Sequence, residues 1–226
     1  MYLLAIDTSA NASAALLDAT NVHDVRVMDS FTSTFSNDHS EVLAPAVERL
    51  LKSAGIGGDS LSGIVVGVGP GPFTGLRVGL ATARTLGFVW KIPVHGVMSL
   101  DAIALEAVAG KPETEFVVAI DARRKELYWA RYTCTGELLD GPHVTVAEEL
   151  PALPVYGAGA GLYAERLQAI GASVVEGFEE SHPNAVAIGT RAAIQLASGE
   201  RPLTTEPLYL RESDAKVPAV MKGKLL

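Results

Sequence analysis

Hydrophobic and polar positions follow two different periods along the first half of the chain. Short, nearly continuous hydrophobic runs are typical of strands inside a sheet, and hydrophobic positions every three or four residues are typical of helices. The first pattern predicts strands at 2–6, 13–17, 22–35 and 64–68, and the second predicts helices at 39–54 and 74–90. The order of strand, strand, strand, helix, strand and helix predicts an α/β unit.

The second half repeats this order less clearly. It predicts strands at 116–120, 127–133, 143–146 and 155–157, a short helix from 147, and helices at 162–170 and 184–198. Both halves also have Ala-Ile-Asp at the end of a buried strand, at 5–7 and 119–121. We interpret the chain as a duplicated α/β fold of two ribonuclease-H-like lobes, 1–110 and 111–226, with the boundary in the Pro-containing stretch 111–114.

Composition narrows the classes of function. The 226 residues carry 18 Lys and Arg against 26 Asp and Glu, a formal charge of −8 that disfavours wholesale wrapping of nucleic acid. Cys134 is the sole cysteine, which excludes an internal disulfide and a multi-cysteine zinc site. No segment has the length and hydrophobicity of a membrane span or the charge pattern of a signal peptide, so we expect a cytoplasmic protein without a membrane partner.

Two segments have the composition of a nucleotide site. Asp7, Thr8 and Ser9 follow the first strand and could hold a phosphate and its cation, or could form a turn that satisfies its own backbone. Gly157 and Gly159 lie at a second strand-to-helix junction, although a G-x-G pair is weak evidence alone. The loop 69–75 lacks the spacing and the lysine of a P-loop, so Thr74 is interpreted as a helix cap.

The helix 74–90 has an unusual stripe of small residues. Gly75, Gly79, Ala83 and Gly87 recur every four residues and therefore share one face. Each glycine costs about 1 kcal/mol relative to alanine in a helix interior, so close packing must compensate. The stripe fits either the protein's own sheet or a helix of a second subunit, and spacing alone does not decide between them.

The remaining polar clusters carry weaker signals. His39 and Glu41 are interpreted as polar residues at a helix start, because no second histidine stands at metal-ligating spacing. The basic run 123–125 is typical of a solvated turn, with an acidic partner or RNA as the alternative. These residues predict neither a catalytic group nor a metal ligand.

Several motifs together resemble the TsaB (YeaZ) family, bacterial paralogues of the threonylcarbamoyltransferase TsaD. The most specific is Gly-Pro-Gly-Pro-Phe-Thr-Gly-Leu-Arg-Val-Gly at 69–79, where the family usually has Ser in place of Pro72; further matches lie at 4–9, 39–41, 93–104, 121–124 and 207–211. The resemblance implies the actin-like ATPase (ASKHA) fold. It also implies cooperation with TsaD and the ATPase TsaE in placing threonylcarbamoyl on N6 of an adenosine beside the anticodon, in tRNAs that read codons beginning with A.

The same resemblance implies how subunits meet. The first-lobe helices of the family form a bundle with TsaD or, when TsaD is absent, with a second copy. The positions carried over to this interface are His39, Glu41, Leu43, Val47, Leu50, Gly75, Leu76, Gly79, Ala83 and Gly87.

One departure bears on activity. Ser99 and Ile103 stand where the catalytic paralogue has its metal histidines, and neither side chain replaces imidazole. We therefore expect a non-catalytic subunit with no intrinsic cofactor and only indirect contact with tRNA. ATP or ADP could bind at the assembled complex, at a residual site of Asp7, Thr8, Ser9, Gly157 and Gly159. The alternative is an enzyme acting alone, either a metallopeptidase or an actin-like ATPase or kinase.

Overall fold

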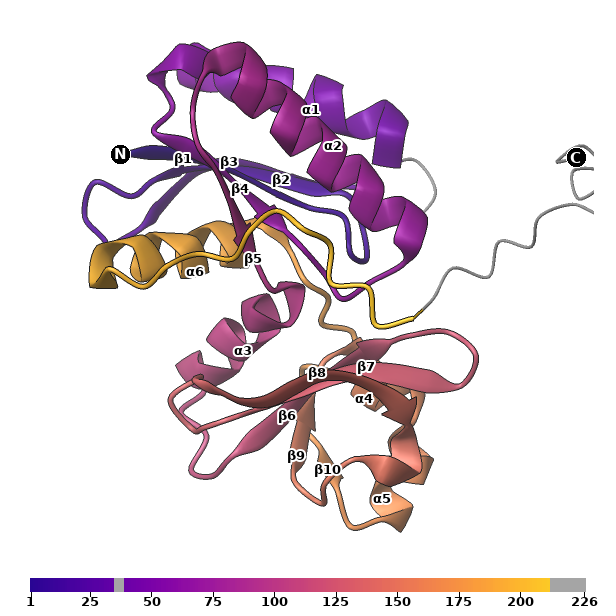
Figure 1. Ribbon diagram of the computed structural model, residues 1–226. Helices are drawn as coiled ribbons and strands as arrows, with labels where there is room; N and C mark the ends of the chain where they lie inside the picture. Colours follow the sequence, from indigo (N-terminus) through magenta and orange to yellow (C-terminus); the bar gives the residue numbers. More distant parts are fainter. Residues whose placement is uncertain (35–38, 212–226) are drawn as a thin grey trace, which may run out of the picture.

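The two halves of the chain fold into similar five-stranded sheets (Figure 1). The computed structural model describes residues 1–34 and 39–211. The first sheet has the order β3-β2-β1-β4-β5 and the second β10-β9-β6-β7-β8. In each, the first strand pairs antiparallel with the next in sequence and parallel with the fourth. The two matching sheets, flanked by helices, confirm the predicted fold class.

The elements have the following bounds. The first half contains β1 (Tyr2–Asp7), β2 (Ser13–Asp18), β3 (Arg26–Thr32), α1 (His39–Ala54), β4 (Gly63–Gly67), α2 (Phe73–Trp90), β5 (Val94–Val97) and α3 (Ser99–Ala109). The second contains β6 (Phe116–Asp121), β7 (Glu126–Tyr132), β8 (Leu138–Val146), β9 (Pro154–Tyr156), α4 (Ala158–Leu162), α5 (Ala164–Ala169), β10 (Ser173–Val174) and α6 (Ala185–Ser198).

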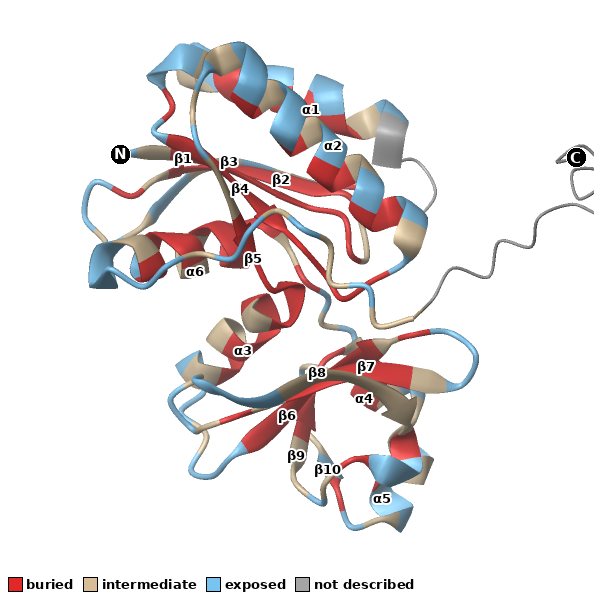
Figure 2. Cartoon of the chain, viewed as in Figure 1, coloured by how far each residue is buried: buried red, intermediate tan, exposed pale blue. Residues whose placement is uncertain are grey.

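The strands β1, β2 and β4 of the first sheet are buried on both faces, as their continuous hydrophobic runs predict (Figure 2). Leu4 and Ile6 of β1 face the core beneath α1 and α2. Leu3 and Ala5 alternate with them and face the opposite core, which is closed by α6. The predicted lobe boundary assigns α6 to the second half, but α6 packs on β1, β2 and β4. The helix α6 therefore completes the first lobe.

The helix α3 lies between the two lobes and was not predicted. Ala102 packs against α6, whereas Leu100 and Ile103 belong to the core of the second sheet. Because α3 is buried on both sides, it lacks the polar face that gives a helix its recognisable period.

Other predicted boundaries differ in smaller ways. The predicted helix 162–170 is two short helices, α4 and α5, and the predicted strand 143–146 is the end of a nine-residue β8. Thr74 lies inside α2, which begins at Phe73, so its assignment as the cap is wrong. No helix among residues 1–34 and 39–211 is long and hydrophobic enough to cross a membrane.

The segment after α6 joins both lobes. Leu203 pairs with Gly96 at the edge of β5. Arg84 of α2 donates hydrogen bonds to Thr205 Oγ1 (2.9 Å) and to its carbonyl oxygen (2.6 Å). Leu208 contacts the cores of both lobes, and Arg211 donates to the carbonyl of Ala122 (2.9 Å) in the second. We call residues 203–211 the C-terminal strap.

Candidate functional site

The turn Asp7-Thr8-Ser9 is an internal hydrogen-bonded cluster. Asp7 Oδ1 accepts hydrogen bonds from the backbone N–H and the hydroxyl of Ser9, at 2.9 and 2.7 Å. Asp7 Oδ2 accepts one from the hydroxyl of Ser99, at 2.8 Å. Thr8 donates to the carbonyl of Gly75 (2.8 Å) and thereby connects β1 to α2. All these side chains are buried, so the polar turn connects elements of the chain.

Two glycines approach this turn closely. A Cβ atom added at Gly67 would lie 1.8 Å from Asp7 Oδ2, and one added at Gly71 would lie 2.8 Å from the carbonyl oxygen of Ser9. The backbone at Gly67 and Gly71 thus packs directly on the turn. The alternative considered from the sequence, a turn that satisfies its own polar groups, describes this arrangement.

The second glycine-rich junction also packs on its own sheet. An added Cβ at Gly157 would lie 2.4 Å from the carbonyl oxygen of Ala119, and at Gly159 it would lie 2.6 Å from the side chain of Leu127. Both glycines therefore allow the turn before α4 and the helix itself to approach β6. The nearest atoms around them belong to the second lobe and not to the Asp7 turn.

The positions aligned with metal ligands have other partners. Besides its bond to Asp7, the Ser99 hydroxyl accepts a hydrogen bond from the backbone N–H of Gly69, at 3.1 Å. Ile103 is fully buried among hydrophobic side chains. Within 1–34 and 39–211, no three His, Cys, Asp or Glu side chains form a group able to hold a metal ion.

The small-residue stripe of α2 faces the protein's own sheet. An added Cβ at Gly79 would lie 2.3 Å from Thr8 Oγ1, and one at Gly87 would lie 2.3 Å from Val94 Cγ2. Gly75 and Ala83 are buried on the same face. The prediction that these four residues contact a second subunit is therefore wrong.

The hydrophobic interface positions are also internal. Leu43, Val47, Leu50 and Leu76 are buried in the core between the first sheet and helices α1 and α2. The helical spacing of these residues marks the side of α1 and α2 that faces the core of the protein. Of the predicted interface residues, Glu41 is exposed, and the side chain of His39 lies outside the described part.

The opposite face of α2 carries the exposed hydrophobic residues that the sequence analysis missed. Phe88 is 85% exposed and Val89 is 61% exposed. Thr85 and Ala81 lie exposed one and two turns earlier, respectively. At 100° per residue, positions 88 and 89 project away from the stripe that ends at Gly87, so a helical wheel would have identified them.

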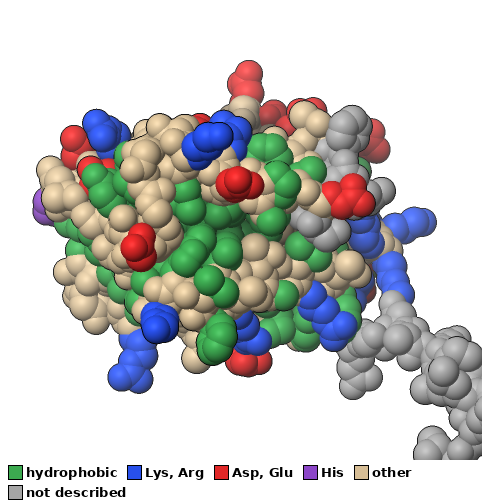
Figure 3. Space-filling view, turned by 90° about the horizontal axis from the view of Figure 1, so that it is seen from above, with side chains coloured by type: hydrophobic (Ala, Val, Ile, Leu, Met, Phe, Trp, Pro, Cys, Tyr) green, Lys and Arg blue, Asp and Glu red, His purple; other side chains and the backbone are tan. Residues whose placement is uncertain are grey.

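Figure 3 views the molecule from the α1–α2 side. Hydrophobic side chains gather across the middle of this face, and charged side chains stand around its margin. We call the exposed residues of α1 and α2 the helical face; they are Glu41, Ala44, Pro45, Glu48, Arg49, Lys52, Ser53, Thr74, Arg77, Ala81, Arg84, Thr85, Phe88 and Val89. An exposed hydrophobic centre with a polar rim is typical of a protein-binding surface.

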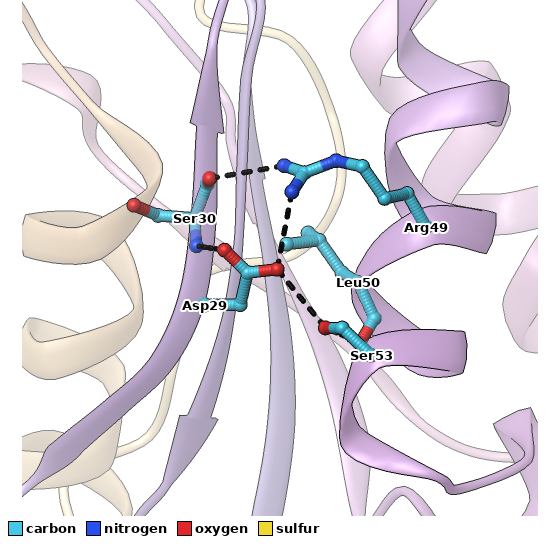
Figure 4. Close-up of polar contacts among 5 residues, drawn as sticks. All are labelled: Asp29, Ser30, Arg49, Leu50 and Ser53. Atoms are coloured by element: carbon cyan, nitrogen blue, oxygen red, sulfur yellow. Dashed lines mark hydrogen bonds and ion pairs between the residues drawn. The ribbon is translucent and has the colours of Figure 1, made fainter.

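Polar contacts hold the α1 side of the helical face against β3 (Figure 4). Arg49 of α1 donates to Asp29 Oδ2 (3.2 Å) and to the carbonyl of Ser30 (3.1 Å), both in β3. Ser53, one turn later, donates to the same Asp29 oxygen at 3.0 Å. These contacts fix α1 against the edge strand, so the face is presented on rigid elements.

The C-terminal strap supports the other side of the face. The ring of Tyr209 stacks on Phe73 with centroids 4.5 Å apart, and its hydroxyl accepts a hydrogen bond from Arg77 Nε at 3.1 Å. The Arg77 guanidinium also lies 3.7 Å from the centre of the Phe73 ring. The beginning of α2 is thus held to a segment that continues into the second lobe.

The basic turn 123–125 is exposed, as predicted. Arg123 forms an ion pair with Asp121 (3.4 Å), and Arg166 donates to the carbonyl of Lys125 (3.3 Å). Whether the turn contacts an acidic partner or RNA stays a prediction.

Comparison with known proteins identifies the family. The family described as TsaD, tRNA N6-adenosine threonylcarbamoyltransferase, matches residues 33–198. YeaZ from Pseudomonas aeruginosa has the same fold, with a TM-score of 0.75 and 30% identity, and the match covers 92% of this chain and 99% of that one. The chain belongs to the TsaB/YeaZ group of the TsaD family.

Sequence relatives agree with this placement. A protein of Mycobacterium tuberculosis without assigned function is 40% identical to this TsaB/YeaZ member over 223 residues, 96% of this chain and 95% of its own. The tRNA threonylcarbamoyladenosine biosynthesis protein TsaB of Escherichia coli is 32% identical over 134 residues. That match spans about half the length of the named relative, 55%, and 58% of this chain.

Proposed function

We propose that this protein acts in tRNA threonylcarbamoyladenosine biosynthesis as a non-catalytic subunit that docks on and activates TsaD. The observation that carries the proposal is the helical face, formed by α1 and α2, on which α2 exposes Phe88 and Val89. Aromatic side chains at the centre of an exposed patch are frequent anchors of protein interfaces. Family membership supports the pathway.

The same surface explains how subunits would pair. A second copy would use this face when TsaD is absent, so self-association and TsaD binding would exclude each other. TsaE would join the assembled complex, and tRNA would contact the complex mainly through other subunits, since the chain carries a net charge of −8.

The proposal is tested by reconstituting tRNA modification from TsaD, TsaE and this chain. The double variant Phe88→Asp, Val89→Asp places two charges in the last turn of α2, at the two most exposed hydrophobic residues of the helical face. It should keep a wild-type circular dichroism spectrum and bind TsaD at least about thirtyfold more weakly, because interface anchors contribute about 2 kcal/mol or more each. The modified fraction of tRNA should fall accordingly.

A matched control distinguishes the surface from general hydrophobic exposure. Leu139→Asp changes a residue of β8 that is 44% exposed and lies on the second lobe. It should leave TsaD binding and tRNA modification at the wild-type level. Full complex formation by the Phe88 and Val89 double variant would refute the docking surface.

Two further measurements address the remaining expectations. Hydrolysis assays and elemental analysis on the isolated chain would overturn the non-catalytic role if they found turnover or stoichiometric metal. Calorimetric titration with ATP and ADP, with and without TsaD, tests our proposal that a nucleotide binds at the assembled complex. Because both carboxylate oxygens of Asp7 already accept hydrogen bonds within the chain, we expect no heat of binding from the isolated chain.

A further inference from the structure

A cavity of about 670 Å³ opens between the two lobes, away from the helical face. One wall comes from α6 and the segment that follows it, and the other from α3, the β7–β8 turn and β8. Its volume lies in the range of about 300–1,000 Å³ that is usual for small-molecule sites. The lining residues are Met98, Asp101, Thr135, Gly136, Glu137, Leu138, Pro142, Arg191, Gln195, Glu200, Arg201, Leu203 and Leu208. None of them belongs to the helical face or to the Asp7 turn.

Arg191 of α6 lines this cavity with unused hydrogen-bonding capacity. Its Nε lies 4.0 Å from Asp101 Oδ2, and its Nη2 lies 3.5 Å from Glu200 Oε1. Within 1–34 and 39–211 it makes these two ion pairs but no hydrogen bond. A guanidinium group has five N–H donors in a planar fork that matches the two oxygens of a carboxylate. The wall therefore offers a binding position for a carboxylate.

Two neighbouring groups are also incompletely satisfied. Gln195 is buried and donates from Nε2 to Glu200 Oε1 at 3.1 Å. Its Oε1 is buried without a hydrogen-bond partner in the part of the chain that the structure describes. The Asp101 side chain is 14% exposed and uses Oδ1 to accept from the Tyr132 hydroxyl (2.9 Å). Its Oδ2 has the Arg191 contact at 4.0 Å, too long for a hydrogen bond.

The balance of charge excludes a simple anion as the best ligand. Arg191 and Arg201 are outnumbered in the lining by the carboxylates Asp101, Glu137 and Glu200. An anion such as phosphate could pair with two guanidinium groups but would face three acidic groups. A ligand that carries a carboxylate and an ammonium group can satisfy both kinds of residue.

The hydrophobic part of the lining completes the description. Met98, Leu138, Pro142, Leu203 and Leu208 supply nonpolar surface beside the charged groups. From these observations we propose that the interlobe cavity binds an amino acid or a similar small zwitterion with a nonpolar side chain. The carboxylate pairs with Arg191, the ammonium group lies toward Glu200 and Asp101, and the side chain packs on the nonpolar wall.

Calorimetric titration of the full chain with matched probes tests this assignment. The amino acids L-leucine, L-methionine, L-phenylalanine and L-threonine are the first probes, and at least one of the nonpolar three should bind saturably. For L-leucine, the comparison is with L-leucinamide, which lacks the carboxylate, and 4-methylpentanoate, which lacks the ammonium group. Each should bind about ten- to a hundredfold more weakly, because each loses hydrogen bonds to a charged group.

Variants locate the binding position. Arg191→Gln should weaken binding of the best amino acid by about ten- to a hundredfold, and Arg191→Lys should recover part of the loss. The control Arg26→Gln removes an exposed arginine of β3 that does not line the cavity, and this variant should bind like wild type. If Arg191→Gln does not fold, Arg201→Gln at the same cavity takes its place.

Several results would overturn the proposal. These are no binding by any of the amino acids, equal binding of L-leucine and L-leucinamide, and wild-type affinity in the arginine variants of the cavity. Binding of inorganic phosphate or spermidine without binding of an amino acid would assign the cavity to a simple anion or cation instead.

Discussion

The buried carboxyl group of Asp101 gives a prediction whose magnitude follows from the structure. Burial raises the pKa of Asp101 from 3.8 to about 6, although the Tyr132 hydroxyl and the Arg191 guanidinium both favour the ionised form. Nearby Glu200 adds to the rise. One pKa unit corresponds to about 1.4 kcal/mol of free energy. The rise in the pKa of Asp101 therefore corresponds to about 3 kcal/mol.

The direction in which stability changes with pH depends on whether the folded or the unfolded protein binds the Asp101 proton more strongly. Between about pH 4 and pH 6 the folded protein holds the Asp101 proton and the unfolded chain has released it. The contribution of this group to the free energy of unfolding therefore decreases as the pH rises through this window. The decrease is complete above about pH 7.

Asp101→Asn keeps a neutral group of the same shape that can still accept from Tyr132. At about pH 7.5 the variant should be more stable than wild type by at most about 3 kcal/mol, and near pH 4 the two should be equal. Urea denaturation of both proteins over this pH range measures the difference, since titrations common to both cancel.

Asp140 provides a control in which the stability difference should change with pH in the opposite direction. This exposed carboxyl has a lowered pKa, mainly because of its hydrogen bond with His143. Asp140→Asn should therefore lose stability toward neutral pH relative to wild type. A stability difference for Asp101→Asn that does not change with pH, or a variant less stable at about pH 7.5, would refute the reasoning.

Two substitutions test the internal packing of the first lobe. Gly79→Ala should lower the free energy of unfolding by about 1–3 kcal/mol, because the new Cβ would lie 2.3 Å from Thr8 Oγ1. The control Ala81→Leu, on the exposed side of the same helix, should change the free energy of unfolding by less than about 0.5 kcal/mol. Ser99→Ala should cost about 1–3 kcal/mol, because Asp7 Oδ2 loses a buried hydrogen bond of 2.8 Å. Chemical denaturation followed by circular dichroism measures these differences, and a Gly79→Ala protein as stable as wild type would contradict the inward orientation of the stripe.

The order of elements could be predicted because local patterns determine it. The buried strands of each lobe are hydrophobic runs that end in Asp, Gly or turn residues, and the two predicted long first-lobe helices are observed. The assignment of α6 to a lobe could not be predicted in this way. Its hydrophobic residues would suit either sheet, and only the path of the chain places Ile188 against Leu3 and Ala5.

The contacts of each candidate site residue also depend on how distant parts of the chain come together in the fold. The sequence suggested that Asp7, Thr8 and Ser9 could form a turn satisfied by itself. It gave no indication that Ser99, 92 positions away, supplies a donor to Asp7. Similarly, the residues that surround the interlobe cavity come from four separate parts of the chain, and none of them forms a recognisable motif.

The small-residue stripe and the helical face are two consequences of one packing arrangement. Because Gly79 packs against the side chain of Thr8 and Gly87 against that of Val94 in β5, this side of α2 lies close to the rest of the first lobe. Phe88 and Val89 then have no internal surface to cover, so their exposure is not explained by folding. The glycines of α2 therefore explain its close packing on the first lobe, and the docking surface that we propose uses the exposed residues on the other side of the same helix.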